Sequence, residues 1–361
     1  MRRWEGAARS LRFGGLVLAG ALLLAGCGEY PGVTEQAKPI HHLYNVLFVV
    51  ATIIFVLVEA AILWASFRYR RRKDDDGSLP PQFHGNTFLE VTWTVIPLAI
   101  VLTLFAMSFQ VISKVDAEAK NPDVTVNILA FQWQWQFTYA GQAVQVEQGQ
   151  PPQDLSIKGT FANPPHIYLP VGEKIHFNEQ SKDVIHSFYV PEFLFKRDLI
   201  PGHTNSFEIT PTKIGVYHGQ CAQFCGLEHN AMHFYIHVVS PTDYQNWLVQ
   251  AKKRMASGCP ADTSPGHIAA KSIAFDKECL TATAGKPFKL LFDNQDAGVP
   301  HNVVVFNGRD ATAPPLTPAA ERAPFPGPKT FTYTLPALQP GRYFYHCDVH
   351  PTAMTGFLIV K

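Results

Sequence analysis

The sequence of 361 residues carries almost no net charge. Its 30 lysines and arginines balance 29 aspartates and glutamates, and no long block of like charge occurs. A nucleic-acid-binding face requires clustered basic residues, and a charged interaction tail requires a run of one sign. Both are missing, so we expect no nucleic-acid partner. The length predicts two or three domains.

Apolar runs are few, and only two are long enough to cross a bilayer. They lie at about residues 43–67 and 89–109. The basic cluster at 68–73 separates them and should remain on the cytoplasmic side. We therefore predict a transmembrane helical hairpin over residues 41–112. Its outer ends, and the whole chain that follows, should face the outside of a bacterial cytoplasmic membrane.

Residues 1–27 have the features of an export signal. Several arginines precede an apolar run at 13–24 that is too short to span a bilayer. The tetrapeptide Leu-Ala-Gly-Cys that ends at Cys27 resembles a bacterial lipobox, which implies cleavage before Cys27 and lipid attachment to its thiol. A lipid at the outer leaflet agrees with the predicted topology. An ordinary signal peptide with an incidental cysteine is the alternative.

One segment concentrates potential metal ligands. Cys221, Cys225, His229 and Met232 follow one another with the spacing Cys-x3-Cys-x3-His-x2-Met, and His186 lies in an apolar strand upstream. Thiolate and imidazole ligands select copper, zinc or an iron–sulfur cluster, and a thioether favours copper over zinc. Two bridging thiolates can hold two copper ions. A disulfide or a zinc site, with Met232 in the core, is the alternative.

Each of two copper ions would bind one histidine and one weak axial group. Met232 supplies one axial group, and the backbone carbonyl of Gln223 supplies the other. This pattern resembles the binuclear copper-A motif of cytochrome c oxidase subunit II, and the resemblance covers about residues 40–245. It implies that electrons pass to subunit I, the haem-copper subunit that reduces O2 to water and pumps protons. It also implies further oxidase subunits as partners.

The resemblance assigns roles to two more residues. Residues 86–97 are similar to the second-helix signature of the family, so Glu90 would mark the mouth of a proton pathway. A solvated carboxylate at a helix end is the alternative. Trp133 lies in an aromatic segment that is similar to the one where a tryptophan receives electrons from cytochrome c or another donor. Aromatic packing between sheets is the alternative.

Two positions depart from the family pattern. Gln223 replaces the usual glutamate between the cysteines. Copper binding is unaffected if only the backbone carbonyl of this residue is a ligand. The magnesium site of the family uses the glutamate carboxylate, so that site is in doubt here. His203 follows Pro201 and Gly202 where the family has an arginine, which weakens the expectation of an arginine contact to subunit I.

The last ninety residues repeat the pattern with a single cysteine. His301 lies in an apolar strand, and Cys347, His350 and Met354 follow on one segment. One thiolate, two imidazoles and an axial methionine form the type 1, or blue-copper, arrangement. The segment resembles the ligand loop of plastocyanin-like cupredoxins. A degenerate copy without metal is the alternative.

Cys259 and Cys279 remain. Disulfides persist in exported domains, so we predict that these two cysteines pair. Two free buried thiols are the alternative.

Short alternating segments with turn signals predict antiparallel sandwiches. The predicted fold is therefore a membrane-anchored, mainly β protein, with a two-helix transmembrane hairpin followed by two Greek-key β-sandwich cupredoxin domains. The predicted boundaries are 1–27 for a lipoprotein-type signal peptide, 41–112 for the hairpin, 113–245 for the copper-A domain, 246–268 for a linker and 269–361 for the blue-copper-like domain.

Taken together, these features predict subunit II of a proton-pumping haem-copper terminal oxidase, with haems only in the partner subunit. A mononuclear copper in the fused domain would pass electrons from a donor to the binuclear centre. Alternatives are the copper subunit of another haem-copper enzyme, such as a nitric oxide reductase, and a non-enzymatic copper-carrying lipoprotein. The latter should have methionine-rich ligand clusters, and the sequence has only five methionines. A quinol oxidase subunit is disfavoured because all copper ligands are present.

Overall fold

The structure is a computed structural model. It describes residues 32–70, 84–118, 121–146, 150–159, 163–257, 266–351 and 353–361. The predicted signal peptide with Cys27, and Cys259, lie outside the described residues.

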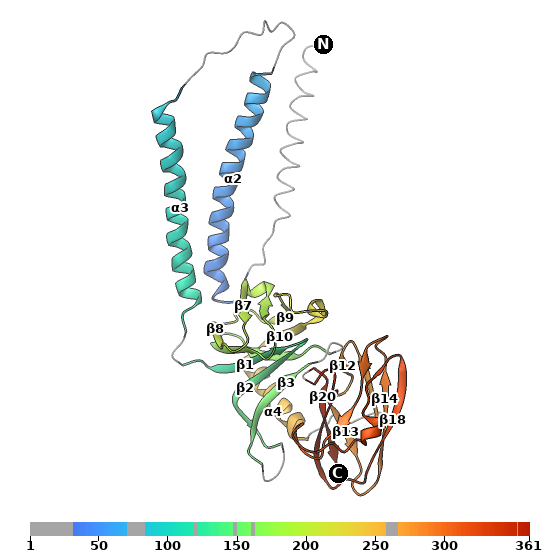
Figure 1. The fold of residues 1–361 in the computed structure, drawn as a ribbon. Helices are drawn as coiled ribbons and strands as arrows, with labels where there is room; N and C mark the ends of the chain where they lie inside the picture. Colours follow the sequence, from blue (N-terminus) through green and yellow to red (C-terminus); the bar gives the residue numbers. More distant parts are fainter. Residues whose placement is uncertain are drawn as a thin grey trace, which may run out of the picture.

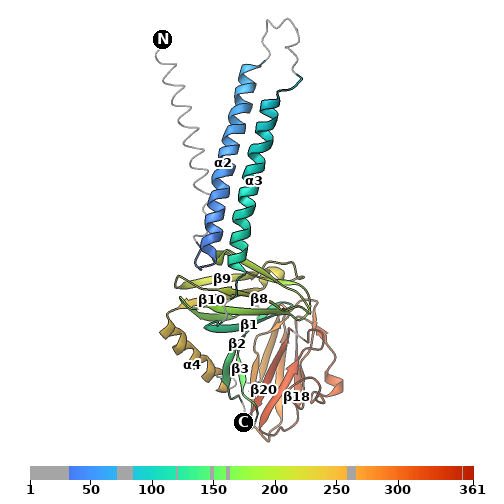
Figure 2. The same ribbon diagram turned by 90° about the vertical axis from the view of Figure 1, so that its left-hand side faces the viewer.

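Two long helices, α2 (Ala37–Arg68) and α3 (Thr87–Val115), stand side by side above the β-sheets (Figures 1 and 2). Both are long and apolar enough to cross a membrane. Most of their large apolar side chains are exposed in the chain alone, as a lipid-facing pair requires. The two predicted apolar helices are confirmed. Each begins before and ends after its apolar run, because the flanking polar residues continue the helix.

The segments that precede α2 and follow α3 both form hydrogen bonds with the first β domain. Before α2, the backbone N–H of Val33 donates to the carbonyl of Glu192 (3.1 Å). After α3, the Arg197 guanidinium donates to the Asp116 carboxylate (2.6 Å). These contacts hold the hairpin against the domain that carries the first cluster of potential ligands.

The first β domain consists of two five-stranded sheets. One has the strand order β3-β2-β1-β5-β8 and the other β4-β10-β9-β6-β7. The strands of the first sheet are β1 (Val124–Phe131), β2 (Gln134–Val144), β3 (Gln153–Lys158), β5 (Ile175–Ser181) and β8 (Asn205–Ile209). Those of the second are β4 (His166–Pro170), β6 (His186–Val190), β7 (Phe195–Leu199), β9 (Gly215–Cys221) and β10 (His233–Val239), with the short helices η1 (Pro191–Phe193) and η2 (His229–Ala231).

Aromatic side chains fill the space between these two sheets. Trp135 and Phe137 on β2 are fully buried, and their rings contact Phe234 of β10 at centroid distances of 5.1 and 5.4 Å. Phe188 on β6 stacks on Phe234 at 4.9 Å. Because β6 and β10 also border the segments with metal-ligand residues, this packing fixes the positions of those segments.

The second β domain is smaller and also has two main sheets, in the orders β12-β11-β14-β18 and β13-β20-β19-β16, with a small β15-β17 pair. Its strands are β11 (His267–Lys271), β12 (Ala274–Phe275), β13 (Cys279–Ala282), β14 (Phe288–Asn294), β15 (Pro300–His301), β16 (Val304–Val305), β17 (Phe325–Pro326), β18 (Lys329–Leu335), β19 (Gly341–His346) and β20 (Thr355–Val360), with the short helix η3 (Ala319–Glu321). The predicted class, mainly β with two apolar helices, is confirmed.

The stretch expected to be a linker differs from the prediction. Residues 241–257 form helix α4 (Pro241–Ser257), and the end of the stretch forms the start of β11. Tyr244, Leu248 and Ala251 are buried at helical spacing against the first domain. Polar residues between them hide this spacing from a search for long apolar runs or alternation.

Candidate metal centres

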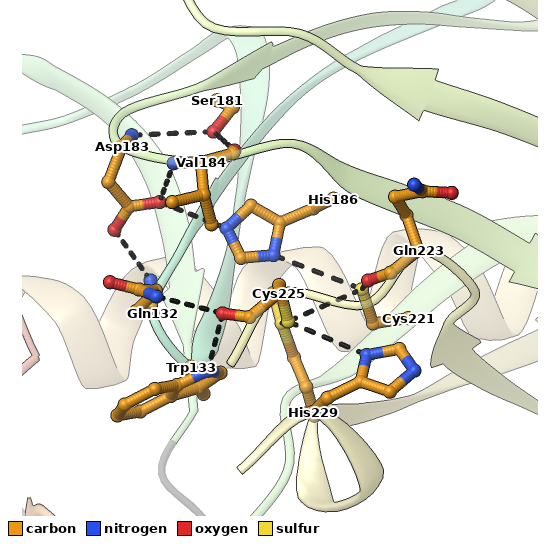
Figure 3. Close-up of polar contacts among 11 residues, drawn as sticks. Gln132, Trp133, Ser181, Asp183, Val184, His186, Cys221, Gln223, Cys225 and His229 are labelled. Atoms are coloured by element: carbon orange, nitrogen blue, oxygen red, sulfur yellow. Dashed lines mark hydrogen bonds and ion pairs between the residues drawn. The ribbon is translucent and has the colours of Figure 1, made fainter. Parts of the chain in front are cut away.

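The first candidate centre lies where β6, β9 and η2 meet (Figure 3). Strands β6 and β9 are antiparallel neighbours, with Phe188 opposite Cys221. This pairing brings His186, at the start of β6, next to Cys221, at the end of β9. The segment after β9 then turns back, and the backbone N–H of Cys221 donates to the carbonyl of Met232 (3.0 Å).

All six predicted ligands of this centre are linked by short contacts. The Cys221 sulfur lies 3.9 Å from His186 Nδ1, 3.3 Å from the Gln223 carbonyl oxygen and 3.8 Å from the Cys225 sulfur. The Cys225 sulfur in turn lies 3.5 Å from His229 Nδ1 and 4.0 Å from the Met232 sulfur. The ligand atoms of His186, Cys221 and Cys225 lie close enough together to hold a metal ion.

Burial and hydrogen bonding tune the thiols of this centre. Cys221 and Cys225 are 5% and 4% exposed, and both are free thiols rather than a disulfide. The hydrogen bond between their sulfur atoms lowers the pKa of Cys221, because a thiolate at Cys221 accepts that bond from the Cys225 thiol. The same contact raises the pKa of Cys225, because a second negative charge beside the first is unfavourable. A bound cation would favour the doubly deprotonated form.

The Asp183 carboxylate, which no sequence motif indicates, orients His186. Asp183 Oδ1 lies 3.0 Å from His186 Nε2, on the far side of the ring from Cys221. The same carboxylate accepts from the backbone N–H groups of Gln132 and Val184 (2.7 Å each). Burial lowers the pKa of His186, but Asp183 and Cys221 outweigh burial, so the net shift is upward. Because Asp183 holds Nε2 of the His186 ring, the Nδ1 atom of the same ring is directed at Cys221.

The second candidate centre repeats this arrangement with one cysteine. Cys347 Sγ lies 3.8 Å from His301 Nδ1, and His350 Nδ1 lies 3.2 Å from the same nitrogen. Met354 is fully buried, and its carbonyl accepts from the backbone N–H of Cys347 (3.0 Å), as Met232 does for Cys221. The ligand atoms of His301, Cys347 and His350 likewise lie close enough together to hold a metal ion.

The second centre also has an orienting carboxylate. Asp296 Oδ2 lies 2.9 Å from His301 Nε2, and its oxygens accept from the backbone N–H groups of Ser272 and Ile273 (2.6 and 2.9 Å). Burial raises the pKa of Cys347, and it lowers the pKa of His301 despite Asp296. In the sequence Asp183 precedes His186 by three residues and Asp296 precedes His301 by five, so no shared spacing indicates the pair.

The other predicted residues lie beside the first centre, at the start of α3 and in the second domain. Trp133 lies beside the first centre, where its indole N–H donates to the Cys225 carbonyl (3.0 Å) (Figure 3). Glu90 lies at the start of α3, and its carboxylate accepts from the backbone N–H of Asn86 (3.2 Å). Cys279 is disulfide-bonded, and its predicted partner Cys259 is outside the described residues. Gln223 is exposed, and only its backbone carbonyl contacts the centre.

We expect Asp183→Asn to lower the metal affinity of the first centre by about 10–100-fold, the usual effect of losing a carboxylate that orients a ligating histidine. The amide leaves the shape of the site intact but orients the His186 ring less strongly. Competition against a copper(I) chelator, on the full chain, measures the affinity of each centre. Asp296→Asn is the matched control: each variant should weaken its own centre and spare the other. Equal weakening of both centres by either variant would contradict the separate roles.

The chemistry of the donors indicates which metal each centre suits. The first cluster offers two thiols, two imidazoles, a thioether and a carbonyl, and the second offers one thiol, two imidazoles and a buried methionine. Structural zinc sites take four nitrogen, sulfur or carboxylate ligands and do not use thioethers. Soft thiolate and thioether donors combined with imidazole suit copper. Fold and donors together define a membrane-anchored copper protein of the cupredoxin class.

Comparison with known proteins identifies the family. The family model for the periplasmic domain of cytochrome c oxidase subunit II matches residues 124–239, and the model for its transmembrane domain matches 28–111. A cupredoxin-like domain model matches residues 245–360. The chain belongs to the cytochrome c oxidase subunit II family, with a cupredoxin-like domain fused at its C-terminal side. Membership makes it a membrane-anchored, copper-binding subunit with partner oxidase subunits.

Curated relatives carry this assignment. The probable cytochrome c oxidase subunit 2 of Streptomyces avermitilis is 38% identical over 280 residues, which cover 68% of this chain and 86% of the relative. Cytochrome c oxidase subunit 2 of Mycobacterium tuberculosis is 32% identical over 299 residues, covering 67% and 82%. Among solved structures, the periplasmic domain of subunit II of cytochrome oxidase from Bradyrhizobium japonicum is 28% identical. It covers 38% of this chain and all of that chain at a TM-score of 0.31, and at that score it adds nothing to the assignment.

Proposed function

We propose that the first centre is a binuclear copper-A site and the second a mononuclear type 1 copper site, and that the chain passes single electrons from the second to the first. The observation that carries this proposal is the repeated ligand arrangement: the same histidine, cysteine and methionine positions, with a second bridging cysteine only in the first domain. When bound, copper supplies one-electron redox chemistry. The residues named above would hold it in two buried sites.

The position of the membrane hairpin supports electron transfer toward the partner subunit. The hairpin anchors the chain beside the haem-copper subunit I, which receives the electrons and reduces O2. With the basic cluster at 68–73 held in the cytoplasm, both copper domains lie on the outer face of the membrane. Cytochrome c or another soluble protein there supplies electrons. Lipid attachment at Cys27 would add a second anchor on the same side.

Three residue roles belong to the same proposal. Trp133 connects the first centre to its electron supply, because its indole N–H is hydrogen-bonded to a ligand segment. Glu90 marks the cytoplasmic mouth of a proton pathway into subunit I, in addition to its contact at the start of α3. With Gln223 in place of a carboxylate, we expect the magnesium site of the family to be weak or missing.

Deletion of residues 258–361 from the assembled oxidase tests the role of the fused domain. The cut follows α4 because Met255 packs against the core of the first domain. We expect slower turnover with the natural donor, since a tethered donor acts at an effective concentration of millimolar order and the deletion removes it. The binuclear signal should persist. Cys347→Ser in the full chain is the matched control that retains the domain and loses its copper. Unchanged turnover in both variants would contradict the proposal.

A further inference from the structure

We propose that the second cupredoxin domain docks directly over Trp133 and thereby closes the electron-accepting face of the first domain to outside donors. Electrons then reach the first centre only by way of the second domain, through Gln134 and Trp133. This inference rests on the proposed function of the two centres. It adds the docking surface, the residues that connect the centres and the exclusion of a direct donor.

Trp133 is shared by the two domains. Its side chain packs against the apolar cluster of the first domain and against that of the second. On the side of the first centre, its indole N–H and the side-chain amide of Gln132 both donate to the Cys225 carbonyl (3.0 and 2.8 Å). Gly226 lies so close that a Cβ there would be 2.9 Å from the indole ring. The indole therefore has a fixed position between the two domains.

Gln134 shows that the second domain covers this face. On β2 the side chains of Trp135 and Phe137 point into the core, so Gln134 and Gln136 share the outer face. Gln136 is part-exposed, whereas Gln134 is only 4% exposed. The difference is explained by its partner: Gln134 Nε2 donates to the carbonyl of Ala353 in the second domain (3.1 Å). Ala353 is the neighbour of Met354.

A second polar contact holds the domains together next to this one. Lys158, the last residue of β3, donates from Nζ to Thr355 Oγ1 (2.9 Å) and lies 3.5 Å from the Glu278 carboxylate. Its ammonium also lies 5.5 Å from the centre of the Phe131 ring. In Figure 2 the second domain, orange to red, lies beside β2 and β3, away from the helices. The docked position is therefore fixed by hydrogen bonds, an ion pair and apolar contact.

These contacts form one continuous route between the ligand segments. It runs from the residue before Met354, through the Ala353–Gln134 hydrogen bond, along the Gln134–Trp133 backbone, and through the indole to the Cys225 carbonyl. Each passage oxidises the site of Cys347 by one electron and reduces the site of Cys225 by one electron. No bond forms or breaks, and no proton is transferred.

The test is designed around Gln134→Leu in the full chain, with Gln136→Leu as the matched control on the same strand face. Leucine leaves the Ala353 carbonyl buried without its donor, but it also removes Gln134 Oε1, which is buried without a hydrogen-bond partner among the described residues. The net effect should be to lower the docking equilibrium about tenfold. The first readout needs no copper. The rate at which an acylating reagent modifies Lys158, followed by mass spectrometry in the metal-free chain, should rise by that factor in Gln134→Leu only. The exposed lysines serve as internal standards.

The second readout uses the copper-loaded chain carrying Cys347→Ser, in which the domain is present but its centre is lost. Lys158 modification first shows that docking persists in this background. Soluble cytochrome c should then reduce the binuclear centre slowly, and adding Gln134→Leu should accelerate this bimolecular reduction about tenfold, in proportion to the undocked fraction. Gln136→Leu should not.

The outcomes separate this inference from the proposed function. If the binuclear absorbance is missing from the loaded parent chain, the proposed function fails. A different result overturns only the docking inference. In that case the absorbance is present, Lys158 reacts at the same rate in all variants, and cytochrome c reduces the Cys347→Ser chain rapidly with either glutamine or leucine at position 134.

Discussion

Cys225→Ser is expected to remove copper from the first centre and leave the second intact. The Cys225 sulfur contacts Cys221, His229 and Met232, so it is the atom that joins the two halves of the proposed site. A serine hydroxyl would not replace the proposed bridging thiolate, because copper prefers soft sulfur donors to a hydroxyl. Copper content should fall from about three ions per chain to about one, with loss of the mixed-valence signal and retention of the mononuclear one.

Cys347→Ser is the converse variant and the control for folding. It should lose about one copper ion and the blue colour and keep the binuclear signal, since its thiol serves the other domain. Metal analysis with electron paramagnetic resonance on both variants distinguishes the centres. Loss of all copper from either variant, or retention of the binuclear signal without Cys225, would contradict the ligand assignment.

A buried carboxylate away from the metal centres is expected to affect the stability of the protein. Glu179 on β5 is fully buried, and neither carboxylate oxygen has a hydrogen-bond partner among the described residues. Burial raises its pKa to about 8, which Arg197 partly offsets and Asp198 reinforces. An unfolded chain would have the ordinary value near 4.5. The folded state therefore binds a proton that the unfolded state has released, and the protein loses stability as pH rises through this interval.

Glu179→Gln should therefore stabilise the protein, by an amount that depends on pH. The gain relative to the parent should be small below pH 4.5, increase by about 1.4 kcal/mol per pH unit up to about pH 8, and stay constant above that. Unfolding of the full chain at several pH values, followed by tryptophan fluorescence, measures it. Glu208→Gln is a suitable control, because Glu208 is buried but has His176 as a partner at 3.5 Å. A gain independent of pH would contradict the buried charge as its cause.

Local sequence determines much of the first centre, and the sequence could therefore predict it. Cys221, Cys225, His229 and Met232 lie on one short segment, so their spacing reports their proximity directly. Only His186 comes from elsewhere in the chain, and the sequence placed it in an apolar strand upstream of the other ligands. The second centre followed from the repeat of the same pattern around Cys347. The two apolar helices were evident because a run of about twenty apolar residues has the length that a bilayer requires.

Other features depend on tertiary packing and could not be predicted. Asp183 and Asp296 serve equivalent histidines from different sequence distances, because the loops before β6 and β15 have different lengths. Helix α4 has a buried face only because the first domain supplies a partner for it. The burial of Gln134 arises from a residue more than two hundred positions away. Alternation along β2 would have placed this side chain in solvent.

The copper content and the electron paramagnetic resonance spectrum of the full chain test the proposed pair of copper centres most directly. We expect about three copper ions per chain, with a mixed-valence binuclear signal and a separate mononuclear signal from the second domain. Bound zinc at the first centre, or a single type of copper signal with no contribution from the His301, Cys347 and His350 site, would contradict this proposal.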